Sequence, residues 1–135
     1  MRVVFLLCVS LNFVLSQTSH EAAEIYAKAY KKALPLRCNS NIVLNDLLNI
    51  ADVLLYRYAV NDTKKTWVSK FNKEELEKYA SETRKMNLTQ ICSDKKALDM
   101  LDQDIIMEHV FYFETGKLLF EYSIKKADCL LLQNQ

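Results

Sequence analysis

The stretch IVLNDLLNIADVLLYRYAV, residues 42–60, decides the fold expected for this chain. It follows a cluster of residues that favour helix starts, Asn39-Ser40-Asn41, and it contains neither glycine nor proline. Most of its apolar residues recur at three- and four-residue spacing and form one broad stripe: Val43, Leu44, Leu47, Ile50, Ala51, Leu54 and Tyr58. We therefore expect one helix here, the most apolar of the protein and its most buried.

The scarcity of turn-forming residues extends this expectation to the whole chain. Gly116 and Pro35 are the only glycine and the only proline among the 135 residues. An all-β fold needs several turns with positive or fixed φ, which glycine and proline supply. The composition therefore predicts an all-α fold, a compact antiparallel bundle of four to five helices stapled by one disulfide. No repeat or linker divides the chain, so residues 17–135 are expected to form this single domain.

Capping signals place the first and third helices. Thr18 and Glu21 form a potential capping box, and Pro35 ends the helix that follows. Asn72 and Glu75 form a second capping box, which starts a helix that ends near Met86. Between the second and third helices, residues 61–72 are expected to cross the surface as a loop, with Trp67 and Phe71 against the core.

A helical pattern also continues from about residue 94 to residue 131. As one helix, this segment would measure about 57 Å at 1.5 Å per residue, too long for its partners. We therefore expect a kink or tight turn near Gly116.

The N-terminal sequence MRVVFLLCVSLNFVLS has the form of a secretory signal peptide. Arg2 supplies its positive end, and residues 3–15 supply its apolar part. A membrane-spanning helix needs about 20 apolar residues, and Asn12 interrupts this shorter run. Residues 1–16 are therefore predicted to be a cleaved signal peptide and not a membrane anchor, and the mature protein is predicted to be secreted and extracellular.

The charge of the mature chain is balanced. It would carry 17 acidic and 17 basic residues, one basic residue fewer than the full chain because Arg2 leaves with the signal peptide. Nucleic acids and anionic membranes select basic surfaces. We therefore expect neither as a partner.

Three cysteines remain once Cys8 leaves with the signal peptide, which predicts one disulfide and one free or intermolecular thiol. In an up-and-down bundle, the connections that hold Cys38 and Cys92 lie at the same end. We therefore expect a Cys38–Cys92 disulfide, with Cys129 either buried or joining two chains in a disulfide-linked dimer. Cys38–Cys129 is the alternative if the chain doubles back at Gly116.

Two sequons, Asn61-Asp62-Thr63 and Asn87-Leu88-Thr89, fall in segments expected to be loops between helices. N-linked glycans require such surface positions in secreted proteins. Asn61 and Asn87 are therefore predicted glycosylation sites.

The sequence contains few residues arranged as a catalytic or metal-binding motif. It lacks the nucleophile-elbow, zinc-protease, Cys-x-x-Cys and glycine-rich phosphate motifs. Asp102, Asp104, Glu108 and His109 superficially resemble a metal cluster, but on a helix Asp102 and His109 lie almost two turns apart. We expect no enzymatic activity, no catalytic residue, no metal and no cofactor.

Five apolar residues are a candidate ligand or partner surface, because a helix cannot turn all of them inward: Val110, Phe111, Tyr112, Phe113 and Phe120. We interpret the chain as a secreted, non-enzymatic recognition protein that acts on an extracellular protein partner through a helix face. It would be a cytokine-like signal, a salivary or effector protein, or an inhibitor. The alternative is a carrier of a small hydrophobic molecule, such as a fatty acid, steroid or odorant, in an apolar cavity of the bundle.

Overall fold

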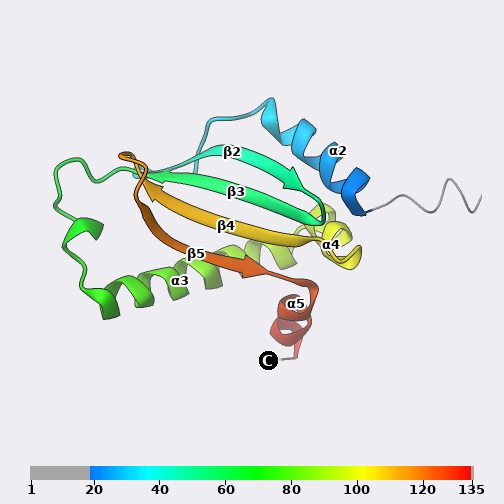
Figure 1. Ribbon diagram of the computed structural model, residues 1–135. Helices are drawn as coiled ribbons and strands as arrows, with labels where there is room; N and C mark the ends of the chain where they lie inside the picture. Colours follow the sequence, from blue (N-terminus) through cyan, green and yellow to red (C-terminus); the bar gives the residue numbers. More distant parts are fainter. Residues whose placement is uncertain (1–18, 135) are drawn as a thin grey trace, which may run out of the picture.

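The computed structural model describes residues 19–134 and shows a mixed α/β fold, not a helical bundle (Figure 1). The predicted signal peptide, residues 1–16, lies outside the described residues. Along the chain the elements are α2 (Ser19–Lys31), β1 (Leu36–Arg37), β2 (Ile42–Ile50), β3 (Val53–Val60), the short 3-10 helix η1 (Val68–Lys70), α3 (Lys73–Cys92), α4 (Lys95–Asp102), β4 (Ile106–Phe113), β5 (Leu118–Ile124) and α5 (Lys126–Gln133).

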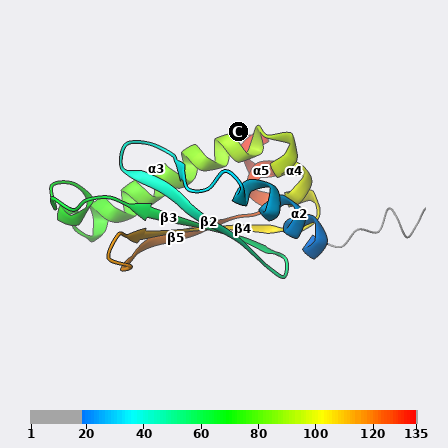
Figure 2. The same cartoon turned by 90° about the horizontal axis from the view of Figure 1, so that it is seen from above.

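The sheet has five strands in the order β1-β2-β3-β4-β5. Neighbouring strands are antiparallel except the central pair, β3 and β4, which is parallel. Parallel strands need a long crossover connection, and residues 61–105 supply it with η1, α3 and α4. Figure 2 shows α2, α3, α4 and α5 on the same side of the sheet, which leaves the opposite face without a covering helix in the described part of the chain.

Residues 42–60 form a hairpin, so the helix expected there is wrong. β2 and β3 pair along their length from Ile42 opposite Val60 to Ile50 opposite Val53. Burial in β3 alternates with a period of two, because Leu54, Tyr56, Tyr58 and Val60 are buried and the residues between them are not. Apolar residues are so dense in this stretch that a helical and a strand pattern both fit it.

Residues other than glycine supply two of the turns that the all-α prediction assumed to be missing, and Gly116 supplies a third. Ala51, between β2 and β3, has φ 52°, and Asp104, just before β4, has φ 62°. Gly116, between β4 and β5, has φ 92°. The scarcity of glycine therefore did not prevent tight turns, and the predicted bundle of four to five helices is wrong.

The long helical pattern at the C-terminal end divides into four elements. A helix does start after Asp94, whose side chain accepts a hydrogen bond from the Lys96 amide, but α4 ends at Asp102. Strands β4 and β5 follow, with the chain turning at Gly116 as expected, and only then does α5 begin. The predicted break is confirmed, whereas the helices on either side of it are strands for much of their length.

One of the two expected capping boxes is confirmed, because α3 begins after Asn72 with the capping box to Glu75. α2 is present and ends at Lys31, ahead of Pro35, but Thr18 of its expected capping box lies outside the described residues. Trp67 and Phe71 pack against the core, as predicted. However, α3 continues to Cys92, well beyond its expected end near Met86.

The core lies between the helices and one face of the sheet. Strand pairing arranges the covered side chains in rows across β2, β3, β4 and β5: Leu44–Tyr58–Phe111–Phe120, Leu47–Tyr56–His109–Tyr122 and Asn49–Leu54–Met107–Ile124. Ala22, Ala23 and Ala27 of α2 are buried in the same core, where their small size lets the helix approach the sheet closely. No helix in residues 19–134 is long and apolar enough to cross a membrane.

Candidate functional site

The uncovered face of the sheet is the first candidate site. Because side chains alternate along a strand, the residues between the core rows point to this face. They also form rows: Val43–Ala59–Tyr112, Asp46–Arg57–Val110–Glu121, Leu48–Leu55–Glu108–Ser123 and Ile50–Val53–Ile106. We call this surface the open face.

A groove of about 710 Å³ lies over one end of the open face. Its lining includes Val43, Ala59 and Tyr112, together with Arg37 on β1. The register of β2 shifts between Leu44 and Asp46, and such a bulge bends a strand and increases its twist. The bend therefore contributes to the hollow shape of this end of the sheet.

Arg57 is the central cation of the open face. Its guanidinium lies 5.1 Å from the centroid of the Tyr112 ring, which is within cation–π range. Asp46 and Glu121 lie in the same row, and Glu108 lies in the next. None of the ion pairs in the described chain involves these four charged side chains, so they are available to a partner.

The apolar part of the open face extends away from the groove. Ile50 is 57% exposed at the hairpin end, whereas Val110 is only 6% exposed between its neighbours on β3 and β5. The open face therefore combines aliphatic side chains, one aromatic ring and a cross-strand row of charges, without a helix over it (Figure 2).

The second candidate site is a stack of rings on the covered face. His109 on β4 is 1% exposed, and its ring lies between those of Tyr56 and Tyr122, at centroid distances of 4.4 and 5.1 Å. The register explains the stack, because these three residues pair directly across β3, β4 and β5.

Asn87 of α3 joins this stack to the helix layer. Its Nδ2 donates to the Tyr122 hydroxyl at 2.8 Å and to Nδ1 of His109 at 3.1 Å. The Tyr58 hydroxyl lies 2.8 Å from the same Nδ1. An amide nitrogen can only donate, so Nδ1 is the acceptor and Nε2 carries the proton of the neutral ring. Nε2 is buried and has no hydrogen-bond partner among the described residues.

Burial determines the ionisation of this cluster. It lowers the pKa of His109 to about 3, raises the pKa of Tyr122 to about 12 and raises the pKa of Tyr58 well above its usual range. The cluster is therefore neutral at physiological pH. A hollow of about 370 Å³ borders it, with Tyr26 and Tyr30 of α2 and Asn87 among the residues that line it.

The residues that resembled a metal cluster are dispersed. Glu108 and His109 lie on opposite faces of β4, while Asp102 ends α4 and Asp104 lies in the turn before β4. Within residues 19–134, no three histidine, cysteine, aspartate or glutamate side chains gather to hold a metal ion.

The sequence-based candidate surface is divided between the two faces of the sheet. Val110 and Tyr112 lie on the open face, whereas Phe111, Phe113 and Phe120 lie on the covered face. Sequence reasoning missed Arg57 and Glu121, which the strand register brings into the row of Val110. The alternation in VLLYRYAV was the available signal for the face of Arg57.

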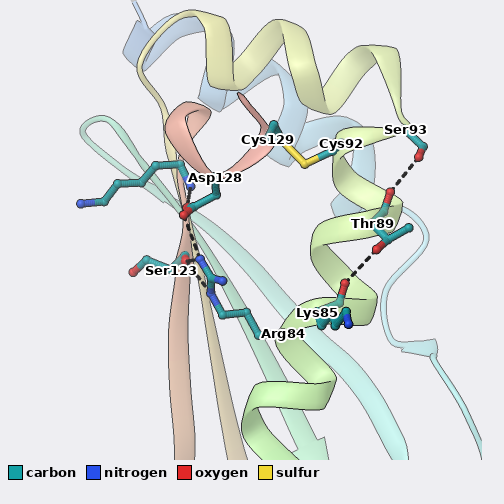
Figure 3. The surroundings of a disulfide bond; sticks show 9 residues. Arg84, Lys85, Thr89, Cys92, Ser93, Ser123, Asp128 and Cys129 are labelled. Atoms are coloured by element: carbon teal, nitrogen blue, oxygen red, sulfur yellow. Dashed lines mark hydrogen bonds and ion pairs between the residues drawn. A yellow bond between two sulfur atoms is a disulfide. The ribbon is translucent and has the colours of Figure 1, made fainter. Parts of the chain in front are cut away.

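The disulfide joins Cys92 and Cys129 (Figure 3), and their Cα atoms lie 5.5 Å apart. Cys38 is free and exposed. The predicted Cys38–Cys92 bond is therefore wrong. The predictions that Cys129 is a free or intermolecular thiol and that it links a dimer are also wrong, because Cys129 is bonded to Cys92. The prediction of a Cys38–Cys92 bond assumed that the last helical segment stays extended, with Cys92 and Cys129 roughly at its opposite ends. In the structure, β4 and β5 double back between them and bring α5 beside α3.

A polar contact next to the disulfide also holds α5. Arg84 of α3 pairs with Asp128 at 3.1 Å and donates to the carbonyl oxygen of Ser123 at the end of β5 (Figure 3). The Asp128 side chain also accepts from the Lys125 amide at the start of α5. The end of the sheet, α3 and α5 are thereby tied together.

The two sequons have different surroundings. Asn61 is exposed in the loop after β3, whereas Asn87 is half-buried in α3 and not in a loop as expected. Glycosylation at either position stays a prediction.

Comparisons with known proteins bear on the fold. No protein-family model matches this chain, and no curated protein sequence matches it. A protein from Pseudomonas aeruginosa described as secreted has a similar structure, with a TM-score of 0.68 and 15% identity over 82% of this chain and 92% of that one.

Two pilotins of type 2 secretion systems are also similar, each at 14% identity over 82% of this chain. The Vibrio vulnificus pilotin has a TM-score of 0.66 with 91% of its chain covered, and the Vibrio cholerae pilotin has 0.62 with 92% covered.

These findings correct both functions expected from the sequence. The cytokine-like interpretation needs a helical bundle, and the carrier interpretation needs an apolar cavity between helices at 42–60, 94–113 and 117–131. Most of these residues form strands instead. The chain has the α/β fold seen in the two pilotins and in the Pseudomonas aeruginosa protein.

Proposed function

We propose that this protein is a binding module that holds a segment of a protein partner against the open face of its sheet. The partner segment carries aliphatic or aromatic side chains, and lysine or arginine flanks them. The observation that carries the proposal is the sheet itself. Its helices lie on one face (Figure 2), and the other face bears largely apolar side chains, most of them half-buried.

The apolar content of the open face supports binding. The uncovered face of an antiparallel sheet is usually polar, because only the other face is packed. Here the uncovered face bears many apolar side chains: Val43, Leu48, Ile50, Val53, Leu55, Ala59, Ile106, Val110 and Tyr112. A contiguous surface of this kind on a single domain usually marks an interaction site.

The charges on the open face select the kind of partner. Asp46, Glu108 and Glu121 outnumber Arg57, and none of them has an ion pair within the described chain. Complementary charges raise the association rate and exclude wrong partners. A basic residue beside the bound apolar segment would pair with Glu108 or Glu121, and an acidic residue near the groove would pair with Arg57.

The structural neighbours support this role. Two of them are pilotins of type 2 secretion systems, and a third is described as secreted. We propose that this chain likewise acts outside the cytosol. The proposed role requires no catalytic group.

Selection from a displayed library of random peptides tests the proposal. We expect selected peptides to share aliphatic residues flanked by lysine or arginine. Leu55→Asp, on the open face, should weaken binding about tenfold or more, because a carboxylate would be buried against apolar side chains. Met86→Asp is the matched control, since Met86 is 69% exposed on α3. It should bind the peptides like the unmodified protein.

Two outcomes of the same experiment would contradict the proposal. If Leu55→Asp, still folded by circular dichroism, binds the peptides with unchanged affinity, the open face is not the binding surface. If Met86→Asp abolishes peptide binding, the binding site includes α3 and not the open face.

A further inference from the structure

We infer that this protein accepts one N-linked glycan, at Asn61, and that Asn87 stays unmodified although it lies in an equally valid sequon. The inference concerns modification and does not rest on the proposed binding function, although Asn61 also lines the groove at one end of the open face. It rests on the hydrogen-bond partners of the two amide groups.

The Asn61 side chain is available. The residue is exposed, and its main chain is fixed because its N–H donates to the carbonyl oxygen of Asn41 at 2.8 Å. Its Oδ1 accepts from the Thr63 amide at 3.3 Å, and no hydrogen bond in the described residues uses its Nδ2. Thr63 is also exposed. Both groups that define the sequon are therefore at the surface.

The loop beyond Asn61 is ordered around one carboxylate. Asp62 accepts from the amides of Thr66 at 3.0 Å, Trp67 at 3.2 Å and Ser69 at 2.8 Å. These bonds depend on Asp62 and on the main chain, not on the Asn61 amide. A glycan on Asn61 would thus leave the bonding of the loop intact.

The Asn87 amide is already used inside the protein. Nδ2 donates to both Tyr122 and His109, so each of its hydrogens has an acceptor between α3 and the sheet. A glycan would replace one of these hydrogens and place a sugar beside a histidine that is 1% exposed. A chain glycosylated at Asn87 could not close α3 onto the sheet. We therefore expect the folded, secreted protein to carry no glycan there.

The modification itself is a group transfer from a lipid-pyrophosphate-linked oligosaccharide. Nδ2 of Asn61 forms a bond to the anomeric carbon, the bond from that carbon to the pyrophosphate oxygen breaks, and the nitrogen loses one proton. The lipid pyrophosphate departs with the bonding electrons, and nothing is oxidised or reduced.

Expression of the full chain in a eukaryotic secretory host tests the inference. The intact mass of the secreted protein, before and after a peptide N-glycosidase, counts the glycans. The same enzyme converts the modified asparagine to aspartate, which identifies the site by peptide mass spectrometry. We expect the mass of one glycan, with the aspartate at position 61.

Two threonine variants remove one sequon each without touching either asparagine. Thr63→Ala should abolish the glycan. Thr89→Ala should leave it unchanged, because Thr89 is exposed and, among the described residues, its hydroxyl donates only to the Lys85 carbonyl within α3. Two glycans on the unmodified protein, none at all, or a loss of mass in Thr89→Ala would each overturn the inference.

Discussion

His109 shows how the sheet register fixes the chemistry of a single residue. The ring is stacked between two tyrosines, and the position of the Asn87 amide fixes its tautomer. Protonation of Nδ1 would place a charge in the core and displace the hydrogen bond from Asn87. The pKa of His109 is therefore lowered to about 3 from the value of 6.5 that it has in an unfolded chain.

The free energy of unfolding should consequently fall as the pH falls below 6.5. Between pH 6.5 and 3 the unfolded chain binds a proton that the folded protein excludes, so acid favours unfolding by up to about 1.4 kcal/mol per pH unit. His109→Phe keeps a ring in the stack and removes the titration. We expect urea unfolding between pH 7 and 5 to show a shallower pH dependence for this variant.

The slope is the deciding measurement, because His109→Phe also removes the acceptor for Asn87 and lowers stability at every pH. His20 is present in both proteins, so its contribution cancels. Equal slopes in the two proteins would show that His109 titrates normally in the folded state.

At the scale of elements, the Cys92–Cys129 bond holds the C-terminal helix. α5 has only eight residues, and short helices depend on tertiary contacts. The disulfide connects it to α3, and the pair of Arg84 with Asp128 adds a second connection (Figure 3).

Replacing both Cys92 and Cys129 by alanine should lower the free energy of unfolding by about 4 kcal/mol, the chain-entropy value for a separation of 37 residues. Cys38→Ala is the control and should change stability little, because Cys38 is exposed and free. Urea unfolding measures both variants. A larger loss for Cys38→Ala than for the double variant would indicate that Cys38 takes part in the native disulfide.

The sequence predicted elements where local chemistry determines them and failed where distant pairing does. Asn72 and Asp94 cap α3 and α4 through hydrogen bonds within a few residues, so the sequence shows them directly. Gly116 marked a real turn for the same reason. By contrast, residues 42–60 contain enough apolar side chains for either a helix or a hairpin, and pairing with β4 stabilises the strands.

The candidate site could be predicted only in part. Val110 and Tyr112 were identified because four consecutive apolar residues cannot all face one core. Arg57 and Glu121 were not, because their common row depends on the registers of β3 with β4 and of β4 with β5. Register between strands far apart in sequence is a property of the folded sheet and is absent from local patterns.

At the scale of the whole molecule, the protein has two layers and therefore two unequal sheet faces. Leu54 and Leu55 are neighbours in β3 that lie on opposite faces. Leu54 is 0% exposed beneath the helices, whereas Leu55 lies half-buried on the open face.

This pair gives a direct measure of the two-layer arrangement. Leu54→Ala should cost about 2–5 kcal/mol of unfolding free energy, as usual for a leucine removed from a closed core. Leu55→Ala should cost about 1 kcal/mol or less, since solvent already reaches its site. Denaturant unfolding of the two variants compares them. Equal losses would mean that both faces of β3 are covered in solution.

The sheet contains two hairpins, β2–β3 and β4–β5, which meet where β3 pairs in parallel with β4. We call this parallel strand pair the seam. Each hairpin pairs strands close in sequence, whereas the seam can form only after residues 61–105 have closed a long loop. Cutting the exposed link between Lys64 and Lys65 would leave one hairpin on each side. The two fragments are then expected to reassociate through the main-chain hydrogen bonds between β3 and β4, which circular dichroism of the mixed fragments would test.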